Sequence, residues 1–301
     1  MKNALSYYYN LVPTSIHQIN KKYKCYIQDQ EYLLVQYEDS LEKVNDFYQL
    51  SVHLFNMQIS CHKIILNINN SAITYINNLP YMLLKVYKTG SKINFDEILF
   101  FSNIMIDSVK FKNLVCNSWH DMWIKKVDYL EYQISQIGKN YPLIRDSFNY
   151  FVGLAENSIS FLNELDGYTD FFSICHKRIN FNGDVKELYN PLNFVLDSKV
   201  RDISEYIKDK FFKEQYSIYE FVKDINLCNL NEKQYILLYG RLLFPSYYFD
   251  IYENIISGNE NEKSLNKILA KINNYNYFLK NVWIEINKYY KLPEIEWIIK
   301  M

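Results

Sequence analysis

The sequence predicts an α+β protein of two lobes, a small β-rich lobe over residues 1–90 and a larger, mainly helical lobe over residues 91–301. Before Gly90, β-rich runs alternate with one amphipathic helical stretch, and after Gly90 the periodicity is almost purely helical. Hydrophobic residues make up 49% of the 301, which is enough for a sizeable core. With only 7 glycines and 6 prolines, little of the chain suits a long linker. We therefore expect one compact bilobal unit.

The first lobe is predicted to hold two β-hairpins with a helix between them. Residues 24–27 and 32–37 are β-rich and flank a polar turn. From residue 41 to 58 apolar residues recur at helical spacing, and Ser40 is the expected N-cap. A second hairpin is predicted to join residues 72–76 and 81–87 through a turn at Asn77 and Asn78.

The second lobe is predicted to consist of helices. In residues 117–137 apolar side chains fall at steps of three and four, and we interpret Trp119 and Trp123 in this stripe as core. A second helix opens after Pro142. Further helices are predicted at 200–212, 216–226, 231–257 (with a break at Pro245) and 262–290. Residues 171–197 form the long non-helical interruption.

Composition and charge exclude several classes of protein. The 33 basic residues nearly balance the 34 acidic ones, so a polybasic nucleic-acid-binding surface is not expected. The five cysteines form no CxxC pair, which disfavours a disulfide framework and a zinc ribbon. No stretch reaches the roughly 20 apolar residues of a membrane-spanning helix, and the start lacks the features of a signal peptide. We expect no transmembrane segment and synthesis in the cytoplasm.

Tyrosine and phenylalanine are unusually frequent, with 29 and 19 residues. Codon bias in an AT-rich genome explains this most simply. A surface that assembles with other proteins is the second explanation, because tyrosine is favoured at interfaces.

Four segments carry a resemblance to a known family: residues 151–160 (FVGLAENSIS), 174–179 (ICHKRI), 190–203 (NPLNFVLDSKVRDI) and 239–245 (YGRLLFP). In order and spacing they resemble the spore-coat kinase-like proteins of endospore-forming bacteria, of the CotS and YutH type, which are relatives of aminoglycoside and choline kinases. The resemblance covers most of the chain. It implies a protein-kinase-like fold, synthesis in the mother cell and a place in the spore coat at the forespore surface.

The resemblance also implies where a catalytic loop lies. Active relatives follow the pattern His-x-Asp-x-x-x-x-Asn. Here His176 fits, but Arg178 stands in place of the aspartate and Gly183 in place of the asparagine, with Asn182 one position away. An arginine keeps its proton near neutral pH and cannot act as a general base.

The parts that hold phosphates are missing as well. No glycine precedes Gly90, so no glycine-rich loop can cover phosphates in the first hairpin. The expected phosphate-binding lysine falls near Gln36, which is neutral, and Lys24 is the other residue that could reach.

The metal-binding aspartate has two candidate positions. Asp197 follows a β-like run but lies only five residues before Asp202, a shorter spacing than in active relatives. On the longer spacing the metal position falls near Asn190 or Leu192, where no carboxylate remains, and we favour this alignment. Asp202, preceded by Arg201, then matches the acid that braces the backbone of the catalytic loop.

Simpler structural roles compete with these interpretations. Cys175 and His176 point to opposite faces of an extended segment, so His176 is expected to be a structural histidine bonded to backbone. A zinc site built from this pair and from Cys61 and His62 is disfavoured because the spacing of metal ligands is absent. Arg178 is either a surface residue or a cation that fills the nucleotide position.

The sequence therefore predicts a non-catalytic kinase-like protein, a pseudokinase, which acts in coat assembly by binding other spore-coat proteins. No cofactor and no metal are expected, and self-association into a homo-oligomer stays open. The alternative is an ATP- and Mg²⁺-dependent small-molecule phosphotransferase with Asp197 as metal ligand and Asp184 or Glu187 as base. A third possibility is a module that binds a nucleotide or metabolite without turnover.

Overall fold

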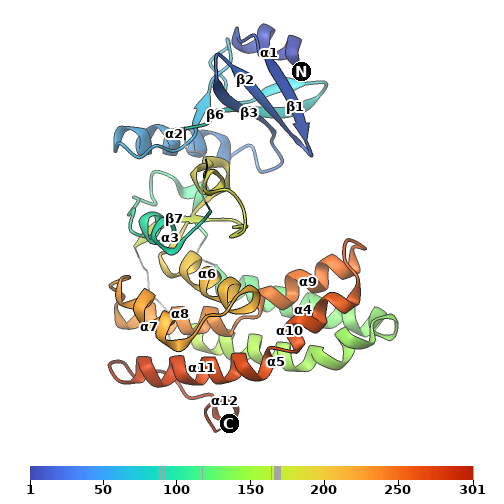
Figure 1. The fold of residues 1–301 in the computed structure, drawn as a ribbon, viewed down its shortest axis with the longest axis vertical. Coiled ribbons are helices and arrows are strands. Elements are labelled where there is room, and N and C mark those ends of the chain that lie inside the picture. Colours follow the sequence, from blue (N-terminus) through green and yellow to red (C-terminus); the bar gives the residue numbers. More distant parts are fainter. Residues whose placement is uncertain (88–89, 91, 117, 164, 166–170, 301) are drawn as a thin grey trace. The chain divides into compact units, whose positions relative to one another are not determined.

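The computed structural model describes residues 1–87, 90, 92–116, 118–163, 165 and 171–300 (Figure 1). By packing, the chain divides into two compact units. The first consists of Met1–Glu97, Ile104–Val115 and Phe172–Asp197, and the second of Ile98–Asn103, Cys116–Phe171 and Ser198–Met301. This division follows packing, whereas the predicted boundary at residue 90 follows the type of element. The boundary therefore stays a prediction.

In the part of the chain that is described, the first unit holds a six-stranded antiparallel sheet. Its strand order is β1-β2-β3-β6-β4, and β5 pairs with β6. The elements are α1 (Lys2–Tyr9), β1 (Ser15–Ile19), β2 (Lys22–Ile27), β3 (Gln30–Gln36), α2 (Lys43–Asn56), β4 (Lys63–Ile65), β5 (Thr74–Ile76) and β6 (Leu79–Lys85).

Both predicted hairpins are confirmed, and positive φ angles explain their turns. Gln28 and Asp29 between β2 and β3 have φ of 48° and 64°, and Asn77 and Asn78 between β5 and β6 have φ of 51° and 64°. Two successive residues with positive φ match the twist of two-residue hairpins. The sequence did not predict α1 or β1. β1 is mostly exposed, so it lacks the alternation that marks a half-buried strand.

Helix α2 confirms the predicted helix, but the predicted cap is wrong. Glu42 is the N-cap and makes no capping hydrogen bond with its side chain. The Ser40 hydroxyl instead accepts a hydrogen bond from the Glu42 amide at 3.3 Å, in the turn that precedes the helix. The helix buries Phe47, Leu50 and Leu54.

The segment of residues 172–197 supplies a small second sheet to the first unit. β7 (Phe172–His176) pairs with β8 (Phe194–Ser198), and the connection contains the 3₁₀ turns η3 (Val185–Tyr189) and η4 (Pro191–Asn193). All five residues of β8 are buried. The prediction of a long non-helical interruption is thus confirmed.

The second unit is helical. Its elements are α4 (Trp119–Ile137), α5 (Pro142–Asn163), α6 (Val200–Lys213), α7 (Ile218–Asn226), α8 (Glu232–Leu243), α9 (Ser246–Ile256), η5 (Glu262–Leu265), α10 (Asn266–Leu269), α11 (Ile272–Asn287) and α12 (Glu296–Ile299). Helix α3 (Phe95–Ser102) has residues in both units, and the 3₁₀ turns η1 (Lys112–Leu114) and η2 (Gly138–Asn140) lie on either side of α4. The predicted break at Pro245 separates α8 from α9. No helix in the described ranges combines the length and apolarity that spanning a membrane requires.

The prediction of one helix over residues 262–290 is wrong. Three elements occupy this range, and Lys271 stands between the last two. The Lys271 ammonium donates to the carbonyl oxygens of Phe211 and Phe212 at the end of α6, both at 2.9 Å. This contact between distant segments has no signature in local periodicity.

Aromatic stacking and one close approach of two helices build the core of the second unit. The rings of Phe151 and Tyr248 stack with centroids 3.7 Å apart. A Cβ added at Gly240 in α8 would lie 3.3 Å from Cβ of Phe161 in α5, so a larger residue here requires the two helices to shift by a few tenths of an ångström. Trp123 is buried as predicted and stacks on Phe244, with centroids 4.2 Å apart.

The other tryptophan of the predicted stripe has a different environment. Trp119 is half-buried and lies between two guanidinium groups, 4.5 Å from that of Arg201 and 4.1 Å from that of Arg241. The core interpretation therefore holds for Trp123, and for Trp119 only in part.

Candidate functional site

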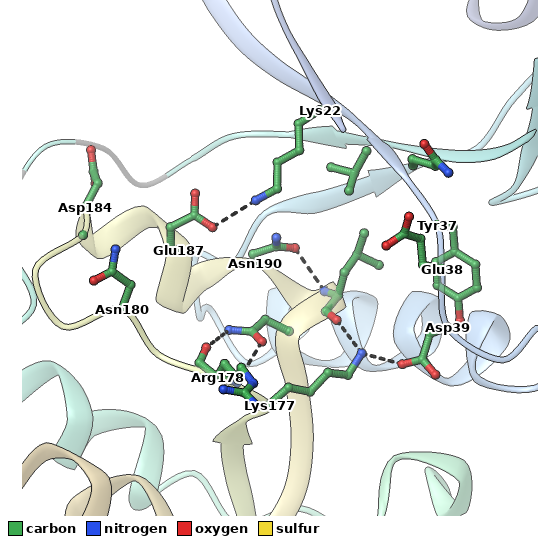
Figure 2. A pocket seen from close by; sticks show the side chains of 15 residues that line it. Lys22, Tyr37, Glu38, Asp39, Lys177, Arg178, Asn180, Asp184, Glu187 and Asn190 are labelled. Carbon is green, nitrogen blue, oxygen red and sulfur yellow. Dashed lines mark hydrogen bonds and ion pairs between the residues drawn. The ribbon is translucent and has the colours of Figure 1, made fainter. Parts of the chain in front are cut away.

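A pocket of about 780 Å³ lies in the first unit (Figure 2). One side is formed by β2, β3 and the residues after β3, which are Lys22, Val35, Gln36, Tyr37, Glu38 and Asp39. The other side is formed by the segment after β7, which supplies Lys177, Arg178, Asn180, Gly183, Asp184, Glu187, Asn190, Leu192 and Asn193. Because this segment carries the predicted catalytic loop, the pocket is the candidate site.

His176 supports this loop from inside the protein. Its side chain is buried, and Nε2 lies 2.9 Å from the carbonyl oxygen of Leu188. Since a carbonyl oxygen only accepts hydrogen bonds, Nε2 carries the proton. The ring also meets the Phe194 ring edge-on, with centroids 5.5 Å apart. His176 thus has the structural role that the sequence analysis favours, and it is not among the residues that line the pocket.

Arg178, which the sequence analysis predicts to stand in place of the catalytic base, lines the pocket and is exposed. Asn193 holds its backbone in place. The Asn193 Nδ2 donates to the Arg178 carbonyl oxygen at 2.8 Å, and Asn193 Oδ1 accepts from the Arg178 amide at 3.4 Å. The loop therefore presents an arginine at the position where the sequence analysis expects the catalytic aspartate, and that correspondence stays a prediction.

Gly183, which the sequence analysis predicts to stand in place of the metal-binding asparagine, occupies a tight turn. Its amide donates to the carbonyl oxygen of Asn180 at 2.7 Å, and an added Cβ would lie 2.9 Å from that same oxygen. A side chain at this position requires the loop to move. Asn182 beside it is exposed and does not line the pocket.

Lys177 contacts three segments of the first unit, namely the residues after β3, η4 and helix α2. Its ammonium lies 2.6 Å from Oδ2 of Asp39 and 2.8 Å from the carbonyl oxygen of Leu192 (Figure 2). It also lies 4.7 Å from the centroid of the Phe47 ring. Burial raises the pKa of Asp39, but hydrogen bonds from Lys177 and Lys43 outweigh it and lower that pKa to about 2. Burial lowers the pKa of Lys177, and Asp39 partly offsets this effect.

Carboxylates also neutralise the lysines of β2 and η3. Lys22 pairs with Glu187 at 3.4 Å, across the pocket in Figure 2. Lys24 and Lys186 both meet Glu31, at 3.3 and 3.4 Å, in an adjoining pocket of about 500 Å³. Lys24 therefore forms an ion pair with Glu31, a residue of its own sheet. Three basic and four acidic side chains line the main pocket, so it carries no excess of positive charge.

The predicted phosphate and metal positions fall partly in the pocket. Gln36 lines it at the end of β3, Asn190 lines it from the N-cap of η4, and Leu192 lines it from within η4. Asp197 is buried in β8, and it is absent from the lining. Asp202 is buried in α6 of the second unit, so its predicted bracing of the loop stays a prediction.

The cysteine and histidine pairs of the disfavoured zinc site lie in the interior of the first unit. Among the described residues, no three His, Cys, Asp or Glu side chains gather closely enough to hold a metal ion. Cys61 and His62 are both buried, and the His62 amide donates to the carbonyl oxygen of Tyr189 at 2.8 Å. These contacts are structural.

Sequence reasoning missed the contacts of Lys177, Asp39 and Asn193. Lys177 stands between two residues that the motif singled out, and the motif says nothing of it. Asp39 lies 138 positions earlier in the chain, after a strand. A lone sequence offers no signal that pairs residues so far apart.

The chain matches the family model described as "Spore coat putative kinase YutH" over residues 2–282. The endospore coat-associated protein YutH of Bacillus subtilis (strain 168) is 31% identical to it over 211 residues. That match covers 60% of this chain and 61% of the relative, so the chain spans about three fifths of the length of the curated relative that it matches.

Solved structures show the fold. An aminoglycoside phosphotransferase from Alicyclobacillus acidocaldarius subsp. acidocaldarius DSM 446 has a TM-score of 0.71 at 11% identity, over 96% of both chains. A spectinomycin phosphotransferase in complex with ADP and spectinomycin has a TM-score of 0.60 at 12% identity, also over 96% of both chains. The predicted kinase-like α+β fold is confirmed. At these identities the likeness concerns the fold alone.

Proposed function

This chain belongs to the spore coat putative kinase YutH family, and we propose that it is a non-catalytic kinase-like protein that acts in coat assembly by binding other coat proteins. The observation that carries the proposal is the charge balance of the pocket. Phosphoryl transfer depends on cations that neutralise phosphate charge. Here Lys22 and Lys177 are already paired with carboxylates, and acidic side chains outnumber basic ones.

A nucleoside triphosphate would bring its negative charge next to the carboxylates of these ion pairs. Solvent screens the Lys22–Glu187 pair, whose side chains are 41% and 42% exposed, so its separation costs little. Displacing Lys177 from Asp39, in contrast, would leave a partly buried carboxylate facing phosphate oxygens. An uncompensated charge in such a place is strongly unfavourable. The pocket is therefore unsuited to a polyanionic ligand.

The pocket also lacks the general base and the metal ligands that phosphoryl transfer requires at the expected positions. Arg178 cannot accept the proton of an attacking hydroxyl. Gly183 has no side chain to hold Mg²⁺, and neither Asn190 nor Leu192 supplies a carboxylate to the pocket. The loss of each group independently argues against turnover.

Family membership and the exposed surface support the binding role. The curated relative is named for its association with the endospore coat. Five tyrosines, Tyr7, Tyr132, Tyr219, Tyr277 and Tyr289, are each at least 69% exposed. Tyrosine supplies large contact area at protein interfaces. We place the protein at the forespore surface, after synthesis in the mother cell.

Calorimetric titration of the purified chain with ATP tests the loss of chemistry. We expect no binding heat up to millimolar ATP, with or without Mg²⁺, and no transfer of phosphate to small hydroxyl-bearing molecules. Partners would then be sought by co-purification from sporulating cells, where recovery of coat proteins is the expected result.

Mg²⁺-dependent heat would instead favour the phosphotransferase alternative. One observation supports that alternative, namely that the carboxylates of Asp184 and Glu187 both line the pocket. In that case product formation should vanish in Asp184→Asn or Glu187→Gln, or in Asp197→Ala if Asp197 binds the metal. Loss of product in any of these variants would overturn the proposed function.

A further inference from the structure

We propose that the pocket of the first unit binds an uncharged, polyhydroxylated ligand of about the size of a sugar. The inference rests on the proposed function in one respect, because it takes the pocket to be free of nucleotide. A volume of about 780 Å³ lies in the range of small-molecule sites. The chemistry of the lining indicates the class of ligand.

Asn190 offers a donor that the protein does not use. The residue is only 6% exposed, and its Oδ1 accepts a hydrogen bond from the Leu192 amide at 3.1 Å. This bond orients the side-chain amide, so that Nδ2 faces the pocket (Figure 2). The described part of the chain supplies no acceptor to this nitrogen. Solvent in the pocket reaches this nitrogen, so a ligand oxygen that accepts from it takes the place of a water molecule.

Acceptors lie beside this donor. Glu187 precedes Asn190 by three residues, and the backbone N–H of Asn190 donates to the backbone carbonyl oxygen of Glu187 at 3.4 Å. The Glu187 carboxylate meets Lys22 through Oε2 alone, which leaves Oε1 available to a ligand. Gln36 lines the same pocket from β3. A hydroxyl group both donates and accepts, and vicinal hydroxyls suit donors and carboxylates placed together.

The ion pairs around the pocket favour a neutral ligand. An anion would face four carboxylates, and a cation would face Lys22, Lys177 and Arg178. Either would compete with the existing pairs and leave one partner uncompensated. A polyol can donate to Glu187 and accept from Asn190 while both the Lys22 and Lys177 pairs stay intact.

Saturation-transfer NMR on the full chain tests the ligand class. The probes are glucose, N-acetylglucosamine and trehalose, with glucose 6-phosphate and glucosamine as charged counterparts. We expect a saturable response to at least one neutral probe and about tenfold weaker binding of the charged ones. No response to any neutral probe, or equal binding of glucose 6-phosphate, would overturn the inference.

One substitution tests the role of Asn190 itself. Asn190→Asp keeps Oδ1 for the Leu192 amide but replaces the donor with a carboxylate oxygen, so we expect about tenfold weaker binding of the neutral probe. The matched control is Asn182→Asp, in the same connection but outside the pocket, and it should bind as the wild type does. Equal melting temperatures establish that both variants fold.

Unchanged binding in Asn190→Asp, or an equal loss in Asn182→Asp, would contradict the assignment. The two proposals fail separately. If the chain binds neither the sugar probes nor ATP, only the inference about the ligand is overturned. If the chain binds ATP, the proposed function is overturned.

Discussion

The two compact units use their lysines in different ways. In the second unit, Lys208 and Lys271 donate to backbone carbonyls at the ends of helices α8 and α6. In the first unit, Lys22 and Lys177 meet carboxylates at the edge of an open pocket. Cations near helix C-termini stabilise the fold. The cations of the pocket are bound to acids in the place where a kinase needs positive charge for phosphates. This difference is what the proposed function leads us to expect, namely a scaffold that is kept and a site whose chemistry has changed.

The largest expected effect lies in the scaffold. Lys208 is only 2% exposed and donates to Glu205, Ser246 and the carbonyl oxygens of Arg241 and Phe244. Lys208→Met removes these bonds and leaves the Glu205 carboxylate without its partner. We expect the free energy of unfolding to fall by about 3–5 kcal/mol, measured by urea denaturation.

Lys213→Met is the control for this change, because Lys213 lies on the same helix and its side chain is 49% exposed beside Asp209. Its removal should cost less than about 1 kcal/mol. Similar losses in the two variants would show that the carbonyl contacts of Lys208 do not carry the stability.

An intermediate and pH-dependent effect is expected at Asp39. Its pKa is lowered from 3.8 to about 2, so in the folded protein this group contributes stability above pH 4 and loses it as the pH falls toward 2. Asp39→Asn should lower the free energy of unfolding by about 1–2 kcal/mol at pH 7, and the difference from wild type should shrink between pH 4 and pH 2.

Denaturation at pH 7 and pH 3 measures this dependence. Asp146→Asn serves as the control, since that side chain is 66% exposed in its pair with Arg145 and should change little at either pH. A difference at Asp39 that stays constant across these pH values would exclude the lysine pairs as its cause.

The smallest effects compare glycines of the two units. Gly183→Ala places a Cβ 2.9 Å from a backbone oxygen of the pocket loop, and we expect a loss of about 1 kcal/mol. Gly153→Ala in the middle of α5 meets nothing within 4 Å and should stabilise the protein by about 0.5–1 kcal/mol. Melting temperatures of the two variants should therefore move in opposite directions. A gain at Gly183 would mean that the loop has room for the asparagine of active kinases.

Local patterns in the sequence predicted most elements. Turns with two adjacent polar residues, such as Asn77 and Asn78, marked the hairpins, and steps of three and four marked α4 and α5. Where prediction failed, a distant contact replaced the local preference. The helix expected over residues 262–290 is interrupted where Lys271 reaches the carbonyl oxygens that end α6. Strand β1 was not predicted because it is mostly exposed and its sequence shows no apolar face.

In the candidate site, too, some features could be predicted from the sequence and others depend on the tertiary structure. The sequence alone predicts that catalytic positions are occupied by Arg178, Gly183 and Gln36. Residue type is enough for this prediction, because it decides which side chain can accept a proton or hold a metal ion. Only the tertiary structure decided that Asn190 lines the pocket while Asp197 is buried away from it. It also decided that Lys177 pairs with Asp39, 138 residues away. Charge neutralisation depends on distances in space, and spacing along a chain does not determine these until the fold brings the segments together.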